Sequence, residues 1–312
     1  MRRQTLRYIY FTIVIVAIIV IAGSVLLQLR STSSPLIGQS ISNDVYNQLL
    51  EISNQGYNIS ALPTNYFKVL PLNFSSNGKP AIIYVGAEWC PYCAAERWAL
   101  IIALLRFGNF SNLEYMLSSS TDVYPNTPTF TFANSTYSST YISFYGIEYQ
   151  DRNYQPLDKV PTQIYNMWEE YGNLSIPFII TEYYYKVGTS IDPGLISGHN
   201  WTYVLEQLQN PNSLVYKEIY SEANLITEMI CKVDGYKPYN VCSHFMQDSS
   251  NSSPLYLVPS LPSQRRDSSV SSSLIPPLIR EYISHFVSSQ KAPTWRDPSI
   301  EFLRSTWYRV GR

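Results

Sequence analysis

The sequence of 312 residues predicts an α/β domain, a mixed sheet flanked by helices, behind one N-terminal transmembrane helix. Three observations lead to the prediction of the α/β domain. A continuous apolar run at residues 81–85 is typical of a buried central strand. Residues 91–106 contain no glycine and have the composition of a largely buried helix. Alternating polar and aromatic residues at 127–149 indicate a strand pair or a Tyr-rich insertion in the domain.

The other elements are predicted from periodicity and turn residues. We expect a short helix at 44–53 capped by Ser42 or Asn43, a strand at 66–70, a second central strand at 113–117, a helix at 162–171, a strand at 174–181 with a hairpin partner at 183–188, and helices at 200–209 and 213–231.

An apolar segment at residues 9–29 is long enough to cross a bilayer. Arginines precede it, and after Arg30 the next basic residue is Lys68, so the positive-inside rule places residues 1–8 in the cytoplasm. The alternative is a signal peptide cleaved after Ala22, but the apolar run continues beyond that position. We therefore expect a single-pass protein of the cell membrane whose main domain is extracytoplasmic.

The domain boundaries follow from these features. We expect a spacer with a short helix at 30–65, the main domain at 66–246 and a Ser/Pro-rich tail at 247–312. The tail has one helical pattern, at 277–287, and is expected to be mostly disordered; docking or binding by the tail is the alternative.

The composition and charge of the chain limit the classes of partner that it can bind and indicate its location. Only 14% of the residues are charged while tyrosines number 27, and residues 31–246 are acidic without a basic stripe, which excludes nucleic acid as a partner. Asn-x-Ser/Thr sequons agree with an exterior location and are candidate glycosylation sites; they begin at Asn58, Asn73, Asn109, Asn134, Asn173, Asn200 and Asn251.

Cys90 and Cys93 form a Cys-Pro-Tyr-Cys motif between the predicted central strand and helix. Two cysteines three apart at a helix start lie one turn apart and can close a small, reducible disulfide. The unpaired amides of the first turn favour a thiolate at Cys90, which raises the oxidising power of the pair. Pro91 suits the first helical position.

Ala-Glu-Trp-Cys-Pro-Tyr-Cys between a strand and a helix resembles the thioredoxin superfamily, and Ile176-Pro177 is similar to its cis-proline loop. The resemblance implies a thioredoxin-like fold with Cys90 as nucleophile, Cys93 as resolving thiol and Pro177 positioning the substrate. Because of their positions beside Cys90 and Pro177, we expect Trp89, Tyr92 and Ile176 to contact the substrate; for Trp89 a place in the core is the alternative. No cofactor is expected. More narrowly, the chain resembles an uncharacterised family of membrane-anchored, thioredoxin-like proteins of thermoacidophilic archaea.

Two departures from the thioredoxin pattern stand out. Tyr84 occupies the position where thioredoxin carries a buried acid. The long spacing from Cys93 to Pro177 implies an insertion, such as residues 119–165. Glu88 and Glu96 are expected to be solvated.

Cys231 and Cys242 flank a short loop, and we predict a structural disulfide between them. A second redox pair is one alternative. Zinc binding with His244 is another, but metal ribbons have paired close spacings and only one occurs here, so no metal site is predicted. His199 and His285 have no suitable neighbours for chemistry.

The function expected from these features is thiol–disulfide exchange on exported proteins, with recharging by a membrane redox partner. The alternative is a non-catalytic, thioredoxin-like surface protein that binds a metal or a protein.

Overall fold

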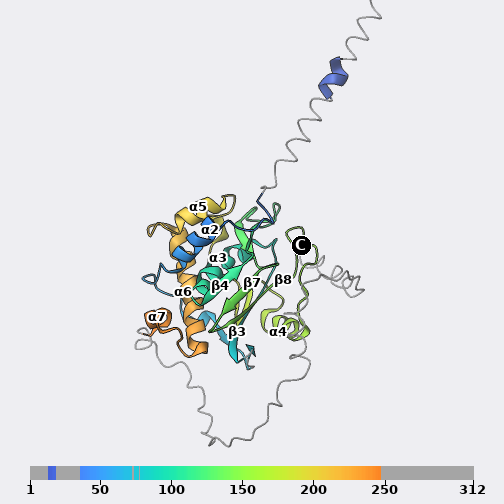
Figure 1. Ribbon diagram of the computed structural model, residues 1–312. Helices are drawn as coiled ribbons and strands as arrows, with labels where there is room; N and C mark the ends of the chain where they lie inside the picture. The colour runs from blue at the N-terminus through green and yellow to red at the C-terminus, as the bar shows by residue number, and fades with distance from the viewer. Residues whose placement is uncertain (1–12, 19–35, 72–73, 77, 247–312) are drawn as a thin grey trace, which may run out of the picture. The chain divides into compact units, whose positions relative to one another are not determined.

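The computed structural model describes residues 13–18, 36–71, 74–76 and 78–246 (Figure 1). No helix within these ranges is long and apolar enough to cross a membrane. Of the predicted anchor at 9–29, only residues 13–18 are described, and they are helical. The rest of that segment and the tail at 247–312 lie outside the described residues.

A mixed six-stranded sheet forms the centre of the domain, which confirms the predicted α/β class. β3 (Lys79–Gly86) lies between β8 (Ser143–Glu148), which runs parallel to it, and β9 (Phe178–Thr181), which runs antiparallel. The sheet continues from β9 to β10 (Tyr184–Val187) and β1 (Lys68–Val69), and β2 (Ser75–Ser76) pairs with the start of β3.

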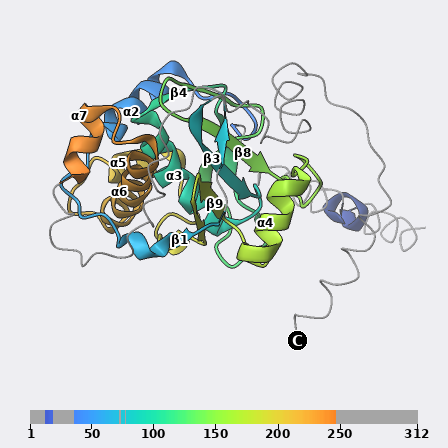
Figure 2. The ribbon, with the colours of Figure 1, turned by 90° about the horizontal axis from the view of Figure 1, so that it is seen from below.

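Helices cover both faces of this sheet, as Figure 2 shows. One face packs against α3 (Pro91–Leu105), with α2 (Asn43–Ser53), α5 (Trp201–Gln207) and α6 (Leu214–Asp234) in the same hydrophobic cluster. The other face packs against α4 (Thr162–Gly172). Along β3, Ile82 contributes to the first cluster and Ile83 to the second, which explains the unbroken apolar run.

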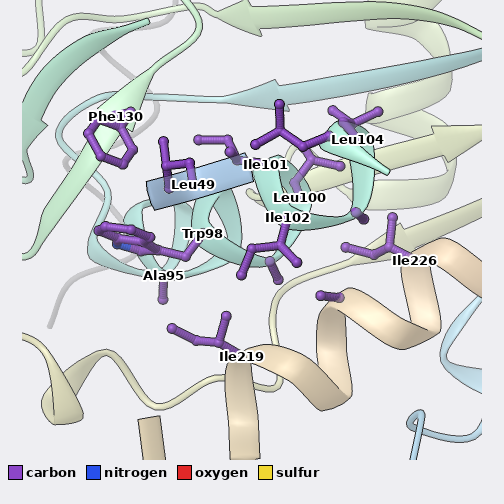
Figure 3. Close-up of a cluster of buried hydrophobic side chains, with 14 of the residues drawn as sticks. Leu49, Ala95, Trp98, Leu100, Ile101, Ile102, Leu104, Phe130, Ile219 and Ile226 are labelled. Atoms are coloured by element: carbon purple, nitrogen blue, oxygen red, sulfur yellow. The ribbon is translucent and has the colours of Figure 1, made fainter. Parts of the chain in front are cut away.

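Among the helices of the described residues, α3 is the most completely buried. Its apolar side chains point in several directions into the core (Figure 3). Trp98, Ile101 and Leu104 are fully inaccessible, and Ile219 and Ile226 of α6 approach them from the neighbouring helix. Burying one such aliphatic side chain contributes about 1.5–3 kcal/mol. The helix that carries the cysteine pair is therefore held rigidly.

α2 also belongs to this core, although its residues were predicted to be part of a spacer. Leu49 and Ile52 are fully buried in the main cluster. The buried guanidinium of Arg106 donates hydrogen bonds to the carbonyls of Ser53, at 2.9 Å, and Gln55, at 3.0 Å. A helix this short needs packing to be stable, and the main domain supplies it.

The prediction of a second central strand at 113–117 was wrong. β5 (Glu114–Leu117) pairs with β6 (Pro128–Thr131) in a separate two-stranded sheet, and β4 (Gly108–Ser111) pairs with β7 (Thr136–Ser139) in another. The place beside β3 is taken by β8, which lies within the predicted insertion at 119–165. Residue pattern identifies a strand but not its partner, because pairing is decided by tertiary packing.

Candidate functional site

Cys90 and Cys93 lie at the N-terminus of α3, at the carboxyl end of β3. Cys90 is the residue that caps the helix, with Pro91 in the first turn, and its Sγ accepts a hydrogen bond from the Cys93 amide at 3.2 Å. Both cysteines are free thiols; Cys90 is 3% exposed and Cys93 is fully buried. Cys90 is therefore the sulfur that a partner can reach first.

The environment separates the two thiols in acidity. Burial opposes ionisation of Cys90, but hydrogen bonds from Cys93 and the charge of Arg97 outweigh it and lower the pKa of Cys90. Burial, reinforced by the hydrogen bond to Cys90, raises the pKa of Cys93 well above its ordinary value. The pair thus consists of one thiolate-forming sulfur with slight exposure and one fully buried, protonated sulfur.

A buried guanidinium lies beneath the pair. Arg97, one turn beyond Cys93 on α3, donates from Nε to Glu148 Oε1 at 2.7 Å and from Nη2 to Glu148 Oε2 at 2.6 Å. Its Nη2 also donates to the carbonyl of Ala87 at 2.7 Å, in the loop between β3 and Cys90. The ion pair joins the dithiol helix to the end of β8, and the bond to Ala87 joins it to the loop that leads to Cys90.

Tyr84 lies beside this guanidinium, at the position where the thioredoxin pattern has an acid. Its ring centroid is 5.8 Å from Arg97 Cζ, and its hydroxyl lies against Gly86. Burial, with smaller contributions from Cys93 and Cys90, raises the pKa of Tyr84 well above its usual range, although Arg97 opposes the shift. The hydroxyl is therefore a neutral donor at the pH of ordinary assays.

Glu88 and Glu96 were expected to be solvated, and the structure buries both. Glu88 accepts hydrogen bonds from the Thr131 hydroxyl at 2.7 Å and the Arg152 amide at 3.3 Å, and burial raises its pKa to about 7. Glu96 forms a buried ion pair with Lys186 at 3.1 Å. Polar residues on an apolar helix usually mark its solvent face, so the pattern around Glu96 predicted exposure, and that prediction was wrong.

Pro177 and Ile176 are brought to the same sheet edge as the cysteines. Phe178, the first residue of β9, is the register partner of Val85 near the end of β3, so the Ile176-Pro177 segment lies opposite the start of the loop to Cys90. The peptide bond between Ile176 and Pro177 is cis, and the Pro177 carbonyl accepts from the Gly188 amide at 2.8 Å. Ile176 itself is half-buried against the core.

Trp89 and Tyr92 flank Cys90. Trp89 is half-buried; its indole donates to Gln150 Oε1 at 3.0 Å and its ring stacks on Tyr154 with centroids 4.9 Å apart. Tyr92 is 43% exposed and meets the edge of Tyr124. Tyr92 is thus free to contact a substrate, while Trp89 is partly committed to its neighbours.

Cys231 and Cys242 are joined by a disulfide with a Cα–Cα distance of 5.5 Å. Both residues are fully buried, and the bond links α6 to the short helix α7 (Tyr239–Cys242). His244 stacks on Tyr57, with ring centroids 4.2 Å apart. Within the described ranges, no group of three His, Cys, Asp or Glu side chains is placed to hold a metal ion.

The sequon asparagines that the structure describes are all exposed: Asn58, Asn109, Asn134, Asn173 and Asn200. Asn73 and Asn251 lie outside the described residues. Exposure makes the five accessible to a glycosylating enzyme, and whether they carry glycans stays a prediction.

Arg97, Glu148 and Glu88 are the site residues that sequence reasoning missed. Arg97 carried a usable signal, since it follows Cys93 by one helical turn within an almost uniformly apolar helix. Glu148 carried no sequence signal, because its approach to Arg97 depends on the pairing of β8 with β3.

A family model described as a domain of unknown function, DUF929, matches residues 65–232. The matched region contains the Cys-Pro-Tyr-Cys motif, Arg97, Glu148 and Pro177. No curated protein matches the chain, and no solved structure does.

Proposed function

This chain belongs to the DUF929 family, whose function is unknown, and we propose that it is a thioredoxin-like thiol–disulfide oxidoreductase that uses Cys90 and Cys93. The observation that carries the proposal is the position of Cys90. Its sulfur caps a buried helix and accepts the amide of Cys93, the residue that would resolve an intermediate. This arrangement stabilises a thiolate at the only cysteine of the pair with any exposure.

The reaction is disulfide exchange through a mixed disulfide. In the reducing direction, the Cys90 thiolate attacks a substrate disulfide, forms a new S–S bond and releases one substrate sulfur as a thiolate. Cys93 then loses its proton to the released thiolate and attacks Cys90, which frees the second substrate sulfur. The substrate gains two electrons, and the Cys90–Cys93 pair is oxidised to a disulfide.

The substrate-facing surface is assigned to residues around Cys90. Tyr92 offers an exposed ring beside the nucleophile, and Ile176 and Pro177 lie at the same sheet edge. In this proposal Pro177 positions the substrate, Tyr92 and Ile176 contact it, and Trp89 contacts it through the part of its ring that is not covered by Tyr154.

The proposed location is the outer side of a cell membrane, with residues 9–29 as the anchor and exported thiol or disulfide proteins as substrates. The Cys231–Cys242 disulfide supports an oxidising compartment, since such bonds are rare in a reducing cytosol. The exposed sequon asparagines agree with this location. A redox partner in the membrane would recharge the dithiol.

Exchange assays on the purified full chain test the proposal. The chain should reduce the interchain disulfides of insulin with dithiothreitol as electron donor, and Cys90→Ser should abolish the reaction. Cys93→Ser should accumulate a covalent mixed disulfide detectable by mass, because no thiol remains to resolve it. The double variant Cys231→Ala/Cys242→Ala is the matched control and should retain exchange. Wild-type rates in Cys90→Ser would refute the assignment.

A further inference from the structure

Two hydrogen-bond donors near the dithiol have no partner among the described residues. They are the hydroxyl of Tyr84 and Nη1 of Arg97, and both side chains are fully buried. A buried donor without an acceptor costs stability, so it calls for an explanation, and a redox or catalytic role is among the recognised ones. Because the Arg97 guanidinium lies over the Tyr84 ring, two such donors from neighbouring side chains indicate a site for an acceptor that the resting protein does not supply.

The contacts place this site beneath Cys93. Arg97 is one helical turn from Cys93, so the two side chains share a face of α3. Ala87 connects them: its carbonyl accepts from Arg97 at 2.7 Å, and its backbone acts to lower the pKa of Cys93. The Arg97 guanidinium is 5.8 Å from the Tyr84 ring, whose hydroxyl lies against Gly86, the residue before Ala87.

We propose that Tyr84 and Arg97 are catalytic residues that hydrogen-bond to the Cys93 thiolate at the moment when the Cys90–Cys93 disulfide opens or forms. This proposal rests on the dithiol function proposed above. It assigns to a neutral hydroxyl and a guanidinium the part of the site where the thioredoxin pattern has an acid.

The step balances in the direction that oxidises a protein dithiol. A substrate thiolate attacks Cys90 and forms the mixed disulfide, and the electron pair of the broken S–S bond leaves on Cys93 as a thiolate. The second substrate thiol passes its proton to that thiolate through solvent and attacks the substrate sulfur of the mixed disulfide. Cys90 leaves as a thiolate, the substrate is oxidised to a disulfide, and the enzyme retains one thiol and one thiolate.

The two donors are needed because Cys93 is a poor leaving group on its own. Burial raises its pKa, so an unassisted Cys93 thiolate would be high in energy inside the core. Donors already fixed in position stabilise this charge without reorganisation, in both directions of the exchange. Tyr84 keeps its proton under the same conditions, because burial raises its own pKa.

The test is the isosteric variant Tyr84→Phe in the full chain. The oxidised protein is mixed with reduced glutathione, the reduced protein with oxidised glutathione, and both rates are measured by stopped flow. Both rates should fall by about tenfold to a hundredfold, the range expected for one hydrogen bond to a charged group. The equilibrium constant with glutathione should stay within about twofold, because Cys93 is protonated in the reduced protein. Lower rates in both directions with an unchanged equilibrium mean that Tyr84 acts on the transition state of the exchange and on neither end state; the structural contribution is measured separately by Tm.

Tyr220→Phe is the matched control. Tyr220 is equally buried, but its hydroxyl has an acceptor, the Ile52 carbonyl at 2.8 Å. The two variants should therefore behave oppositely: Tyr220→Phe should lower Tm and keep the exchange rates, whereas Tyr84→Phe should not lower Tm and should slow the exchange.

Wild-type rates in Tyr84→Phe would overturn this inference. If Cys90→Ser is inactive in the same assay, the proposed function stands and only the role of Tyr84 fails. If Cys90→Ser is also fully active, the proposed function itself fails.

Discussion

Arg97 and Glu148 form a two-point ion pair in which both side chains have no solvent exposure, with an Nη2–Oε2 distance of 2.6 Å. Arg97 comes from the helix that begins with the dithiol, and Glu148 from the last position of the strand beside β3. The Glu148 amide donates in turn to Asp158 Oδ2 at 2.9 Å. The pair thus joins the helix that carries Cys90 and Cys93 to the sheet and places a permanent positive charge near the cysteines.

Removing one partner of the Arg97–Glu148 ion pair should strongly destabilise the protein. Glu148→Ala leaves the Arg97 charge buried without a counterion, and we expect a loss of about 3–5 kcal/mol in the free energy of unfolding. The double variant Arg97→Met/Glu148→Leu should lose much less, because no buried charge remains. Urea denaturation of both variants measures the difference. Equal losses in the two variants would show that the charges do not matter to stability.

Stability should fall as the pH rises from about 4.5 to 7. Burial raises the pKa of Glu88 from 4.5 to about 7, so the folded state holds its proton more tightly than the unfolded chain does. The stabilisation by the protonated Glu88 is fully present below the pKa of the unfolded chain, 4.5, and is lost as the pH rises through the pKa of the folded protein, about 7. A pKa shift of this size corresponds to about 3 kcal/mol in the free energy of unfolding. Burial shifts Glu96, to about 7, and Asp158, to about 6, in the same direction.

Urea midpoints measured at pH 4.5 and pH 8 test this dependence. The wild type should be the more stable at pH 4.5, and Glu88→Gln, which cannot ionise, should flatten the profile. An unchanged slope in Glu88→Gln would assign the pH dependence to other groups.

Gly86 is required for space rather than for backbone conformation. A Cβ atom built at this position would lie 2.1 Å from the Tyr84 hydroxyl oxygen and 2.4 Å from its ring. Gly86→Ala should therefore displace Tyr84, lower the free energy of unfolding by about 1–3 kcal/mol and slow the exchange.

Gly38 offers the matched control. At Gly38 a Cβ would meet nothing within 4 Å, but φ is +75°. Gly38→Ala should cost only about 1 kcal/mol of backbone strain and leave the exchange rates unchanged, which thermal unfolding and exchange assays will compare.

The Cys231–Cys242 disulfide closes a loop with a sequence separation of 11 residues. Its removal in Cys231→Ala/Cys242→Ala should lower the free energy of unfolding by about 2–3 kcal/mol, because the unfolded chain regains loop entropy. Guanidinium denaturation will measure this loss. A parallel loss of exchange activity at a temperature where the variant is folded would instead favour the alternative that this pair relays electrons.

Local pattern was sufficient for much of the scaffold. The helix predicted at 91–106 is α3, the helix at 162–171 is α4, and the hairpin after Pro177 is β9 with β10. These elements carry strong apolar periodicity, proline and turn signals within their own residues. The strand at 113–117 had the same kind of signal and was assigned to the wrong sheet, since its partner β6 cannot be read from its own residues.

The sequence by itself determined the dithiol, the helix that carries it, the proline segment and the tyrosine at position 84, because each is expressed in neighbouring residues. The tertiary structure alone decided that Arg97, Glu88 and Glu96 are buried and that Glu148 meets Arg97. The physical reason is that a charge is tolerated in a core only when a partner from elsewhere in the chain reaches it. That partner is supplied by strand pairing, and strand pairing is a property of the whole fold.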